Sequence, residues 1–553
     1  MNVLRDGMRV VIGSPFWKNV GPQWSGAGSA TVVDLVQRAC DRHGTAPALI
    51  FEDGLVVSYR DLLDRAERFA GALRRGVGPG ERVAVMLANR AEFMIAWLAA
   101  IAARVTAVAM NPGSRSHDTV HVLRDSESKL IVTDAEHREL LESVRAQCPD
   151  LLEILWVGAP EPDGLLSYSA GLPPLKFSES GAERDDITNI FYTSGTTGPP
   201  KGCMVDHEWW LRTVDVLLRR VPSGPEDRQL CCLQFFYGDP CHQLLECLHT
   251  GGALVVMRRF SVSRFWDVVR DNGVTQILSF SSIPLFLLKA PPTPRDRQNK
   301  VRLARHLAMP PHLHREIVRR WGFPWVEGYG ITEGNIVAGM PLEYAEEMIG
   351  SGSIGIPAPE VSLRIVDGDG RDVYPGHVGE FLVKGPAMVR GYLNRPEATA
   401  EVMRDGWLRT GDLGRADERG FLYFVGRKKD IVRRSGQNIS ATEVEDVLRS
   451  HPKILDAAVI AVSDELRGEE VKAYVLPIDG ESQETVPPED LIAFCAERLS
   501  AFKIPRYIEY RSSDFARTPS MRIRKEILRQ ERPDLTAGAW DREDSARSGR
   551  RGQ

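Results

Sequence analysis

The chain has 553 residues, of which 43% are hydrophobic, 26% charged and 8% aromatic, as in a soluble globular protein with a large core. Lys and Arg total 70 and Asp and Glu total 75, so the formal net charge is −5. Nucleic acid is therefore not an expected partner, because binding phosphate backbones requires a basic surface. Small acidic substrates remain compatible, because a pocket can be basic within a neutral protein.

The N-terminus lacks the pattern of a signal peptide, and Arg104 interrupts the most apolar segment, residues 93–110. We therefore expect no membrane span. The eight cysteines are scattered, with no CxxC pair. This distribution favours reduced thiols and a cytoplasmic location over disulfides or a metal site.

Helical and strand patterns alternate from residue 30 to residue 135. They predict helices over 31–43, 58–76 and 91–103, and strands over 82–87, 106–109 and 130–132. This βαβ order predicts a mostly parallel sheet covered by helices, and a second block of the same kind is expected over about 187–335.

After about residue 350, short strands and glycine turns predict a small β-barrel or a twisted antiparallel sheet. From about residue 430 a new α+β unit is expected, with a helix over 442–449, a strand over 457–462 and a helix over 488–499. The segment after Asp534 is small, polar and charged, and it is expected to be disordered.

Residues 192–202 read YTSGTTGPPKG. Glycines in such a loop let backbone amides approach a ligand closely, and hydroxyl groups and a lysine add further donors. The pattern indicates a loop that binds nucleotide phosphates through Thr193, Ser194, Gly195, Thr196, Thr197, Gly198 and Lys201. The sequence matches neither GxxxxGK[ST] nor GxGxxG, which disfavours a P-loop NTPase and a Rossmann dehydrogenase.

This loop resembles the signature of the adenylate-forming superfamily, which includes acyl-CoA synthetases, peptide-synthetase adenylation domains and luciferases. Three further segments resemble motifs of that family in the same order: GYGITE at 328–333, GWLRTGDLG at 406–414 and GRKKDIVRRSGQNI at 426–439. The resemblance covers nearly the whole chain. It implies an α/β fold with a large N-terminal AMP-binding domain, residues 1–426, and a small mobile C-terminal domain, residues 427–534. The hinge would be Lys429, and residues 535–553 would form the tail.

The resemblance also implies roles for single residues. Tyr329 and Gly330 would lie near the adenine, Thr332 would contact the α-phosphate, and Glu333 would bind Mg²⁺. A carboxylate is a suitable hard oxygen ligand for this ion. The remaining implied sets are Asp412 and Arg427 for the ribose; Ser435, Gly436 and Gln437 for the pantetheine arm of CoA; and Phe236, Tyr237, Gly238 and Gly328 for the acyl pocket.

Family members run two half-reactions in one pocket. A carboxylate first attacks the α-phosphate of ATP, and after rotation of the C-terminal domain a thiol attacks the acyl-adenylate. The first step normally uses a Lys in a PSGK-type turn. Here residues 517–528 read RTPSMRIRKEIL, which places Met521 at the Gly and Arg522 at the Lys. Arg keeps the charge but not the compact shape of the ammonium group.

Two further departures concern the acyl pocket. A GGAP-like turn of the family appears as LAMP at 307–310, which loses both glycines. The aromatic motif that often contains a His appears as FFYGDP at 235–240. Asp239 does not match the pattern by which amino-acid-activating relatives hold an α-amine, so a carboxylic acid without an α-amine is the expected substrate.

We hypothesise an acyl-CoA ligase-like enzyme that forms a thioester from an acyl-adenylate and CoA, with adenylation weak or lost. A separate adenylating enzyme would then supply the adenylate. The pattern also resembles the acyl-CoA ligase pairs of platensimycin-type diterpenoid pathways, which would place it in antibiotic biosynthesis. Two alternatives stay open: a complete ligase that uses ATP, Mg²⁺ and Arg522, and a non-catalytic protein that binds nucleotides or acyl ligands. The thiol of a carrier protein in place of CoA also stays open.

Overall fold

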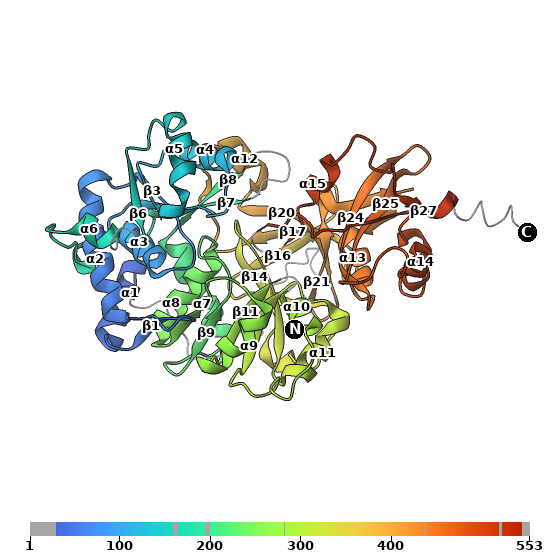
Figure 1. Cartoon of the computed structure of the whole chain (residues 1–553), viewed down its shortest axis with the longest axis horizontal. Coiled ribbons are helices and arrows are strands. Elements are labelled where there is room, and N and C mark those ends of the chain that lie inside the picture. The colour runs from blue at the N-terminus through green and yellow to red at the C-terminus, as the bar shows by residue number, and fades with distance from the viewer. Residues whose placement is uncertain are drawn as a thin grey trace, which may run out of the picture.

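The computed structural model describes residues 29–158, 164–193, 200–280, 283–435, 437–518 and 522–544. Figure 1 shows a large body formed by the N-terminal part of the chain and a smaller body, coloured orange to red, formed by the C-terminal part. Several predicted positions lie outside the described residues, namely Ser194, Gly195, Thr196, Thr197, Gly198, Gly436 and Met521.

The first sheet has seven strands in the order β18-β8-β7-β4-β3-β5-β6. Strands β3 to β7 pair in parallel within it, whereas β8 and β18 add antiparallel pairs at one edge. The strands are β3 Arg82–Met86, β4 Thr106–Ala109, β5 Leu130–Asp134, β6 Glu153–Val157, β7 Ile187–Thr193, β8 Lys201–Asp206 and β18 Gly391–Tyr392. The neighbouring helices are α2 Tyr59–Gly76, α3 Ala91–Ala102, α4 Ser116–Asp125, α5 Arg138–Val144, α6 Gly164–Ser169 and α12 Pro396–Val402.

The predicted helices and strands of this first block are confirmed to within one or two residues. Helix α1 (Val32–His43) and helix α2 each begin with a capping box, at Thr31 and Ser58. In both, the N-cap hydroxyl accepts a backbone N–H of the first turn while an aspartate accepts the N-cap amide, which satisfies donors that would otherwise lack partners. Helix α3 is buried nearly all round, which explains its apolar composition.

The second sheet has a parallel centre, formed by β1 and β9 to β13. Its strands are β1 Pro47–Phe51, β2 Val56–Ser58, β9 Arg228–Cys231, β10 Ala253–Val256, β11 Gln276–Phe280, β12 Leu303–Leu307 and β13 Trp325–Ile331. Its helices are α7 His207–Arg220, α8 Gly238–Thr250, α9 Val262–Asp271, α10 Ile283–Lys289 and α11 Pro311–Trp321.

The predicted start of the second block, about residue 187, is wrong. Strands β7 and β8 complete the first sheet instead, because β7 is buried along most of its length and pairs with β4 on one side and β8 on the other. The early strands β1 and β2 pair with each other and join the second sheet through β10. The described chain therefore passes from the second sheet to the first before β3 and returns to the second sheet at β9.

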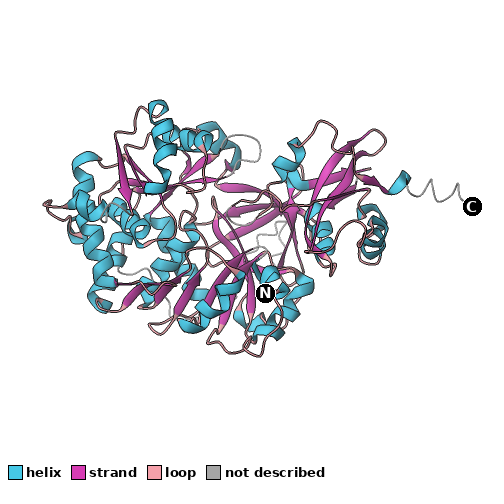
Figure 2. Ribbon diagram, in the orientation of Figure 1, coloured by secondary structure: helices cyan, strands magenta, loops and turns pink. Residues whose placement is uncertain are grey.

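Antiparallel strands continue the second sheet beyond β13, which brings its total to 14 strands. They are β14 Asn335–Gly339, β15 Ser353–Pro357, β16 Ser362–Val366, β17 Gly379–Lys384, β19 Met403–Arg404, β20 Trp407–Ala416 and β21 Leu422–Arg427. The short antiparallel unit expected after residue 350 is thus joined to the parallel sheet by hydrogen bonds through β14 and β15. Figure 2 shows these strands between the helix-covered body and the C-terminal domain.

The C-terminal domain contains a six-stranded sheet. Its elements are β22 Ile431–Arg434, β23 Gln437–Ser440, α13 Ala441–Arg449, β24 Ile454–Asp464, β25 Gly468–Pro477, α14 Pro488–Ala496, β26 Tyr507–Tyr510, α15 Lys525–Gln530 and β27 Trp540–Asp541. The prediction of a disordered tail from residue 535 is wrong for residues 535–544, because β27 pairs with β26 at the sheet edge. Residues 545–553 lie outside the described part of the chain.

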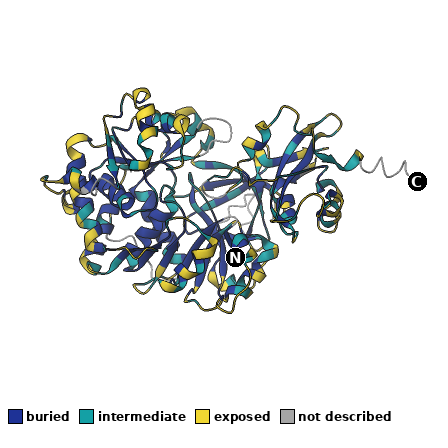
Figure 3. Cartoon of the chain, viewed as in Figure 1, coloured by how far each residue is buried: buried dark blue, intermediate teal, exposed yellow. Residues whose placement is uncertain are grey.

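Buried side chains line both sheets and the centre of the C-terminal domain, as the dark blue regions of Figure 3 show. All eight cysteines are buried free thiols. No helix in the described part of the chain is long and apolar enough to cross a membrane.

The LAMP turn follows β12 and has a strained backbone. Ala308 has φ of +72°, in the left-handed region where a Cβ atom is unfavourable. The buried Glu327 side chain supports the turn, since its two oxygens accept the backbone N–H groups of Ala308 at 2.6 Å and Met309 at 2.8 Å. The sequence shows that this turn lacks the two glycines of the family's motif. The structure shows that Ala308 takes a left-handed conformation there and that a buried carboxyl group holds the turn.

We expect Ala308→Gly to raise the free energy of unfolding by about 0.5–1 kcal/mol. Relief of the left-handed alanine, about 1–2 kcal/mol, exceeds the extra unfolded-state entropy of glycine, about 0.5–1 kcal/mol. Ala398→Gly in helix α12 is the matched control and should lower stability by about 0.5–1 kcal/mol. Denaturant titration of both variants measures the two effects; equal destabilisation by both would show that the Ala308 backbone is not strained.

Candidate active site

Asp412 and Arg427 are brought together by strand register. Strands β20 and β21 run antiparallel, and the two residues are direct partners in this pairing. Asp412 is 2% exposed, and its Oδ1 lies 3.3 Å from Nε of Arg427. The Tyr329 hydroxyl, at the end of β13, donates to Asp412 Oδ2 at 2.6 Å. Three strands of the second sheet thus converge on one buried carboxylate.

The Asp412 carboxylate is well placed to accept ligand hydroxyls. Burial raises the pKa of Asp412, while Arg427 and the Tyr329 hydroxyl lower it. Within the described residues, Oδ1 is buried and accepts no hydrogen bond despite the nearby Arg427. A buried oxygen without a donor is unfavourable, so a hydroxyl from a ligand would satisfy it. Burial also raises the pKa of Tyr329 well above its usual range, so this hydroxyl keeps its proton.

Glu333 and Lys201 lie near one another through Tyr392. The Tyr392 hydroxyl donates to Glu333 Oε1 at 2.7 Å, and Lys201 Nζ lies 5.0 Å from the centre of the Tyr392 ring. Thr332 and Glu333 are half-buried just after β13, and Thr193 ends β7 with its hydroxyl donating to the Lys201 carbonyl at 3.4 Å. Glu333 offers one hard oxygen ligand, which fits Mg²⁺ completed by phosphate oxygens and water.

Arg522 reaches the same region from the C-terminal domain. It interacts electrostatically with Asp412, Tyr237 and Asp239 of the large domain, and with Arg427. The Arg522 side chain is exposed. Protein atoms around it remove part of its hydration, which lowers the pKa of Arg522, and repulsion from Arg427 lowers this pKa further. Arg522 therefore lies close enough to Asp412 and Arg427 to interact with both.

Three of the predicted acyl-pocket residues lie at the start of helix α8, whereas Gly328 lies in β13. Phe236 and Tyr237 have ring centroids 4.4 Å apart, and Gly238 begins the helix. A Cβ atom at Gly328 would lie 3.4 Å from the guanidinium nitrogens of Arg220. Burial lowers the pKa of Arg220 to about 10. The buried guanidinium group of Arg220 therefore lies next to Gly328.

The predicted CoA loop does not join this cluster. The Ser435 amide donates to the carbonyl of Arg467 at 2.8 Å, and Gln437 begins strand β23. Lys429 lies in a short 3-10 turn between β21 and β22, where burial lowers its pKa. Arg522 and Ser435 thus occupy separate parts of the C-terminal domain.

The two domains also contact each other between α10 and β24. Lys289, at the end of α10, donates to the carbonyls of Ile454 at 2.9 Å and Leu455 at 2.7 Å in β24. The Arg517 guanidinium lies 5.8 Å from the centre of the Phe286 ring. Burial lowers the pKa of Lys289 to about 8, with Asp456 opposing and Arg449 adding to this effect. These contacts fix the present arrangement of the domains.

Sequence reasoning missed Tyr392, Arg220 and Lys289. Tyr392 is 59 residues from its partner Glu333, and no spacing pattern relates them. Arg220 ends a helix as an ordinary basic residue would, so only the fold shows it to be buried. Lys289 is recognised only once the C-terminal domain is in place.

Comparisons with known proteins agree with this geometry. Residues 36–393 match the model of the AMP-binding enzyme family, and residues 443–522 match that of the AMP-binding enzyme C-terminal domain. The chain is 30% identical to crotonobetaine/carnitine–CoA ligase of Citrobacter koseri over 522 residues, covering 88% of this chain and 96% of that ligase.

Solved structures show the same fold. The o-succinylbenzoate CoA synthetase of Bacillus subtilis, in complex with its acyl-adenylate intermediate, has a TM-score of 0.78 and 28% identity. That match covers 89% of this chain and 97% of the synthetase. ATP-bound MatB from Rhodopseudomonas palustris has a TM-score of 0.80 and 28% identity, covering 91% of this chain and 99% of MatB. The chain therefore belongs to the AMP-binding enzyme family, and among its members it resembles the acyl-CoA ligases.

Proposed function

We propose that this enzyme transfers an acyl group from an acyl-adenylate to CoA, and that its own adenylation step is weak or lost. The observation that supports the proposal is the position of Arg522. Its charge interacts with Asp412 and Arg427, and the resemblance to the family aligns it with the usual lysine. Family membership supports the broader assignment as an acyl-CoA ligase.

The chemical argument concerns shape and charge. A lysine ammonium is a compact point charge that can bridge a carboxylate and a phosphate, whereas a guanidinium is planar, forked and fixed in its donor geometry. Arg522 also shares the pocket with a second guanidinium, that of Arg427, which repels it. A site shaped for an ammonium group would hold this side chain poorly in the transition state of adenylation, where catalysis depends on positioning.

In the proposed reaction the large domain, residues 1–426, holds the adenylate. Asp412 and Arg427 bind the ribose, Tyr329 and Gly330 lie along the adenine, and Thr193, Lys201 and Thr332 face the phosphate. Ser194, Gly195, Thr196, Thr197 and Gly198, which lie outside the described residues, would bind the phosphates with them. Glu333 is the residue that would hold Mg²⁺, which neutralises phosphate charge in members that use ATP. The C-terminal domain, residues 427–534, turns about Lys429.

Thioester formation follows in the second arrangement. The CoA sulfur attacks the acyl carbon, the bond between that carbon and the phosphate oxygen breaks, and AMP leaves with the electron pair. Ser435, Gly436 and Gln437 would line the path of the pantetheine arm. Phe236, Tyr237, Gly238 and Gly328 would hold an acyl group without an α-amine. A separate enzyme that supplies the adenylate, a role in antibiotic biosynthesis and a cytoplasmic location stay predictions.

A complete ATP-dependent ligase is the second candidate. The presence of a cation over the pocket favours it, because Arg522 keeps the charge of the usual lysine. Under this reading carboxylic acid, ATP, Mg²⁺ and CoA are all substrates or cofactors. The non-catalytic alternative has less support, since the Asp412, Glu333 and Lys201 groups are all in place.

Half-reaction assays separate the candidates. Wild type should form acyl-CoA from synthetic acyl-adenylates and CoA, but at least about 100-fold more slowly from the acids with ATP, Mg²⁺ and CoA, which corresponds to about 2.7 kcal/mol of lost transition-state stabilisation. Arg522→Lys should raise the second rate and leave the first unchanged. Mass spectrometry of acyl-CoA over a panel of acids measures both; comparable wild-type rates from both inputs would favour the complete ligase.

Tyr329→Phe should weaken AMP binding about tenfold, because the buried Asp412 carboxylate loses its hydroxyl donor and its hydrogen bonds to the ribose are displaced. Tyr423→Phe is the matched control, since Tyr423 donates to the carboxylate of Asp417 at 3.1 Å elsewhere on the same sheet. Isothermal titration calorimetry measures both affinities. Unchanged AMP binding in Tyr329→Phe would place the nucleotide elsewhere.

Lys289→Met should shift the protein toward arrangements in which the two domains are apart. In this arrangement burial lowers the pKa of Lys289 to about 8, so the ammonium loses its proton more readily here than when the domains are apart, and a rise in pH through that value favours this arrangement. Small-angle X-ray scattering should therefore show a smaller radius of gyration at pH 9 than at pH 7 for wild type, and no such change for Lys289→Met. Lys503→Met, which loses a pair with Glu443 within the C-terminal domain, should behave as wild type; a pH-independent wild type would refute this role.

A further inference from the structure

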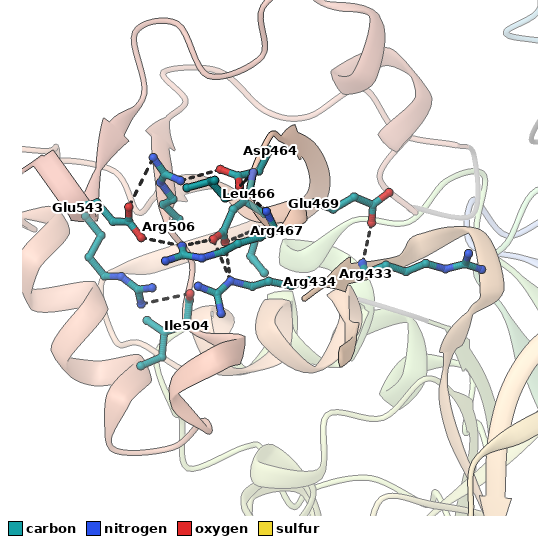
Figure 4. A network of polar contacts seen from close by, with 12 residues as sticks. Arg433, Arg434, Asp464, Leu466, Arg467, Glu469, Ile504, Arg506 and Glu543 are labelled. Carbon is teal, nitrogen blue, oxygen red and sulfur yellow. Dashed lines mark hydrogen bonds and ion pairs between the residues drawn. The ribbon is translucent and has the colours of Figure 1, made fainter. Parts of the chain in front are cut away.

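The last described segment, residues 535–544, adds a strand that lies beyond the matched C-terminal family domain, which ends at residue 522. Trp540 and Asp541 pair with Ile508 and Tyr507 of β26. Figure 4 shows Glu543, which follows β27, beside Arg467 and Arg506, near Asp464 and Leu466 of the β24–β25 hairpin.

Glu543 connects this segment to Arg467 at the start of β25. Its Oε1 lies 2.6 Å from Nη1 of Arg467. Asp541 supports the same arrangement by pairing with Arg506 at 3.0 Å, and Arg506 in turn pairs with Asp464 at 2.8 Å. Two acidic residues of the C-terminal segment thus bind two arginines beside the hairpin.

Arg467 in turn contacts the turn between β22 and β23, here called the Ser435 turn (Arg434, Ser435 and Gln437). The carbonyl of Arg467 accepts the Ser435 amide at 2.8 Å. Its guanidinium pairs at 2.5 Å with the fully buried carboxylate of Glu470, which also binds Arg434 Nε at 2.8 Å. An unbroken series of polar contacts therefore runs from Glu543 to both the backbone and the side chain of the Ser435 turn.

The Ser435 turn requires such support. Ser435 has φ of +48°, a left-handed conformation that costs a serine free energy and persists only where its surroundings enforce it. Leu466, beside Arg467 at the hairpin tip, is 94% exposed, so little apolar packing holds the tip in place. Polar contacts therefore hold Arg467 in place, and the Arg467 carbonyl in turn holds the Ser435 amide.

We propose that the C-terminal segment positions the Ser435 turn for the thioester step, with Glu543 and Arg467 as positioning residues. This inference rests on the proposed function, in which the Ser435 turn lines the path of the CoA thiol. We call the contacts of Glu543 and Arg467 the brace. Neither residue is among the groups that interact electrostatically with Arg522, so the brace is proposed to act on the CoA step and not on the binding of the adenylate.

The test compares Glu543→Gln with wild type in the reaction of a synthetic acyl-adenylate with CoA. We expect kcat/KM for CoA to fall about three- to tenfold, as for loss of one charge-assisted contact, with unchanged affinity for a non-hydrolysable acyl-adenylate analogue. Glu481→Gln, which removes an exposed pair with Lys453 in the same domain, is the control and should leave both values unchanged.

Hydrogen exchange provides a readout that does not depend on activity. Peptides covering residues 431–440 should exchange faster in Glu543→Gln and in a chain ending at residue 534, at an unchanged melting temperature for Glu543→Gln. If hydrogen exchange and kcat/KM for CoA are both unchanged in Glu543→Gln, or if kcat/KM for CoA rises, the positioning role of Glu543 and Arg467 is wrong. Either result leaves the proposed function intact. Absence of thioester formation by wild type from any adenylate would overturn both.

Discussion

The buried carboxylate of Asp412 is the constraint on which the pocket depends. A charged group that is 2% exposed is stable only with partners, and its partners come from two other strands, Tyr329 on β13 and Arg427 on β21. Those strands lie in one continuous sheet because β14 and β15 join the parallel part to the antiparallel part. The fold thus assembles this site from segments almost a hundred residues apart.

The second constraint, under the proposed function, is that the C-terminal domain must be held in this arrangement and also released from it. Its contacts with the large domain include two hydrogen bonds from Lys289, the approach of Arg517 to Phe286, and the ion pairs of Arg427 with Asp412 and of Lys428 with Glu380. Hinge motions of this kind need an interface that holds two arrangements of similar free energy. A few polar contacts that water can replace suit this purpose better than a large apolar surface.

Local sequence patterns predict much of the secondary structure. Capping residues Thr31 and Ser58 and the apolar run of β4 depend only on neighbouring residues, so the sequence predicts these elements nearly to the residue. Sheet membership depends on distant pairing, which is why β7 was assigned to the wrong sheet and β1 was not placed at all. The strand β27 was missed because a polar two-residue strand has no periodicity to detect.

The site shows the same division. Asp412 and Arg427 were predicted from motifs and meet through strand register, whereas Arg220 and Tyr392 are recognised only from burial and contacts in three dimensions. The LAMP departure was visible in the sequence, but its consequence was not. Only the structure shows that Ala308 adopts the left-handed conformation and that the Glu327 side chain holds the turn.

The arrangement of the C-terminal domain is compatible with the proposal that one half-reaction is lost without the other. Arg522 precedes α15, whereas Ser435 lies in the β22–β23 turn and its amide donates to the carbonyl of Arg467, directly before β25. The two positions share no contact within the described residues, so a substitution at one leaves the backbone of the other undisturbed, and effects at such sites are expected to be independent. Under the proposed function, a change at residue 522 would therefore act on adenylation and leave the Ser435 turn and the Asp412 site available for the transfer to CoA.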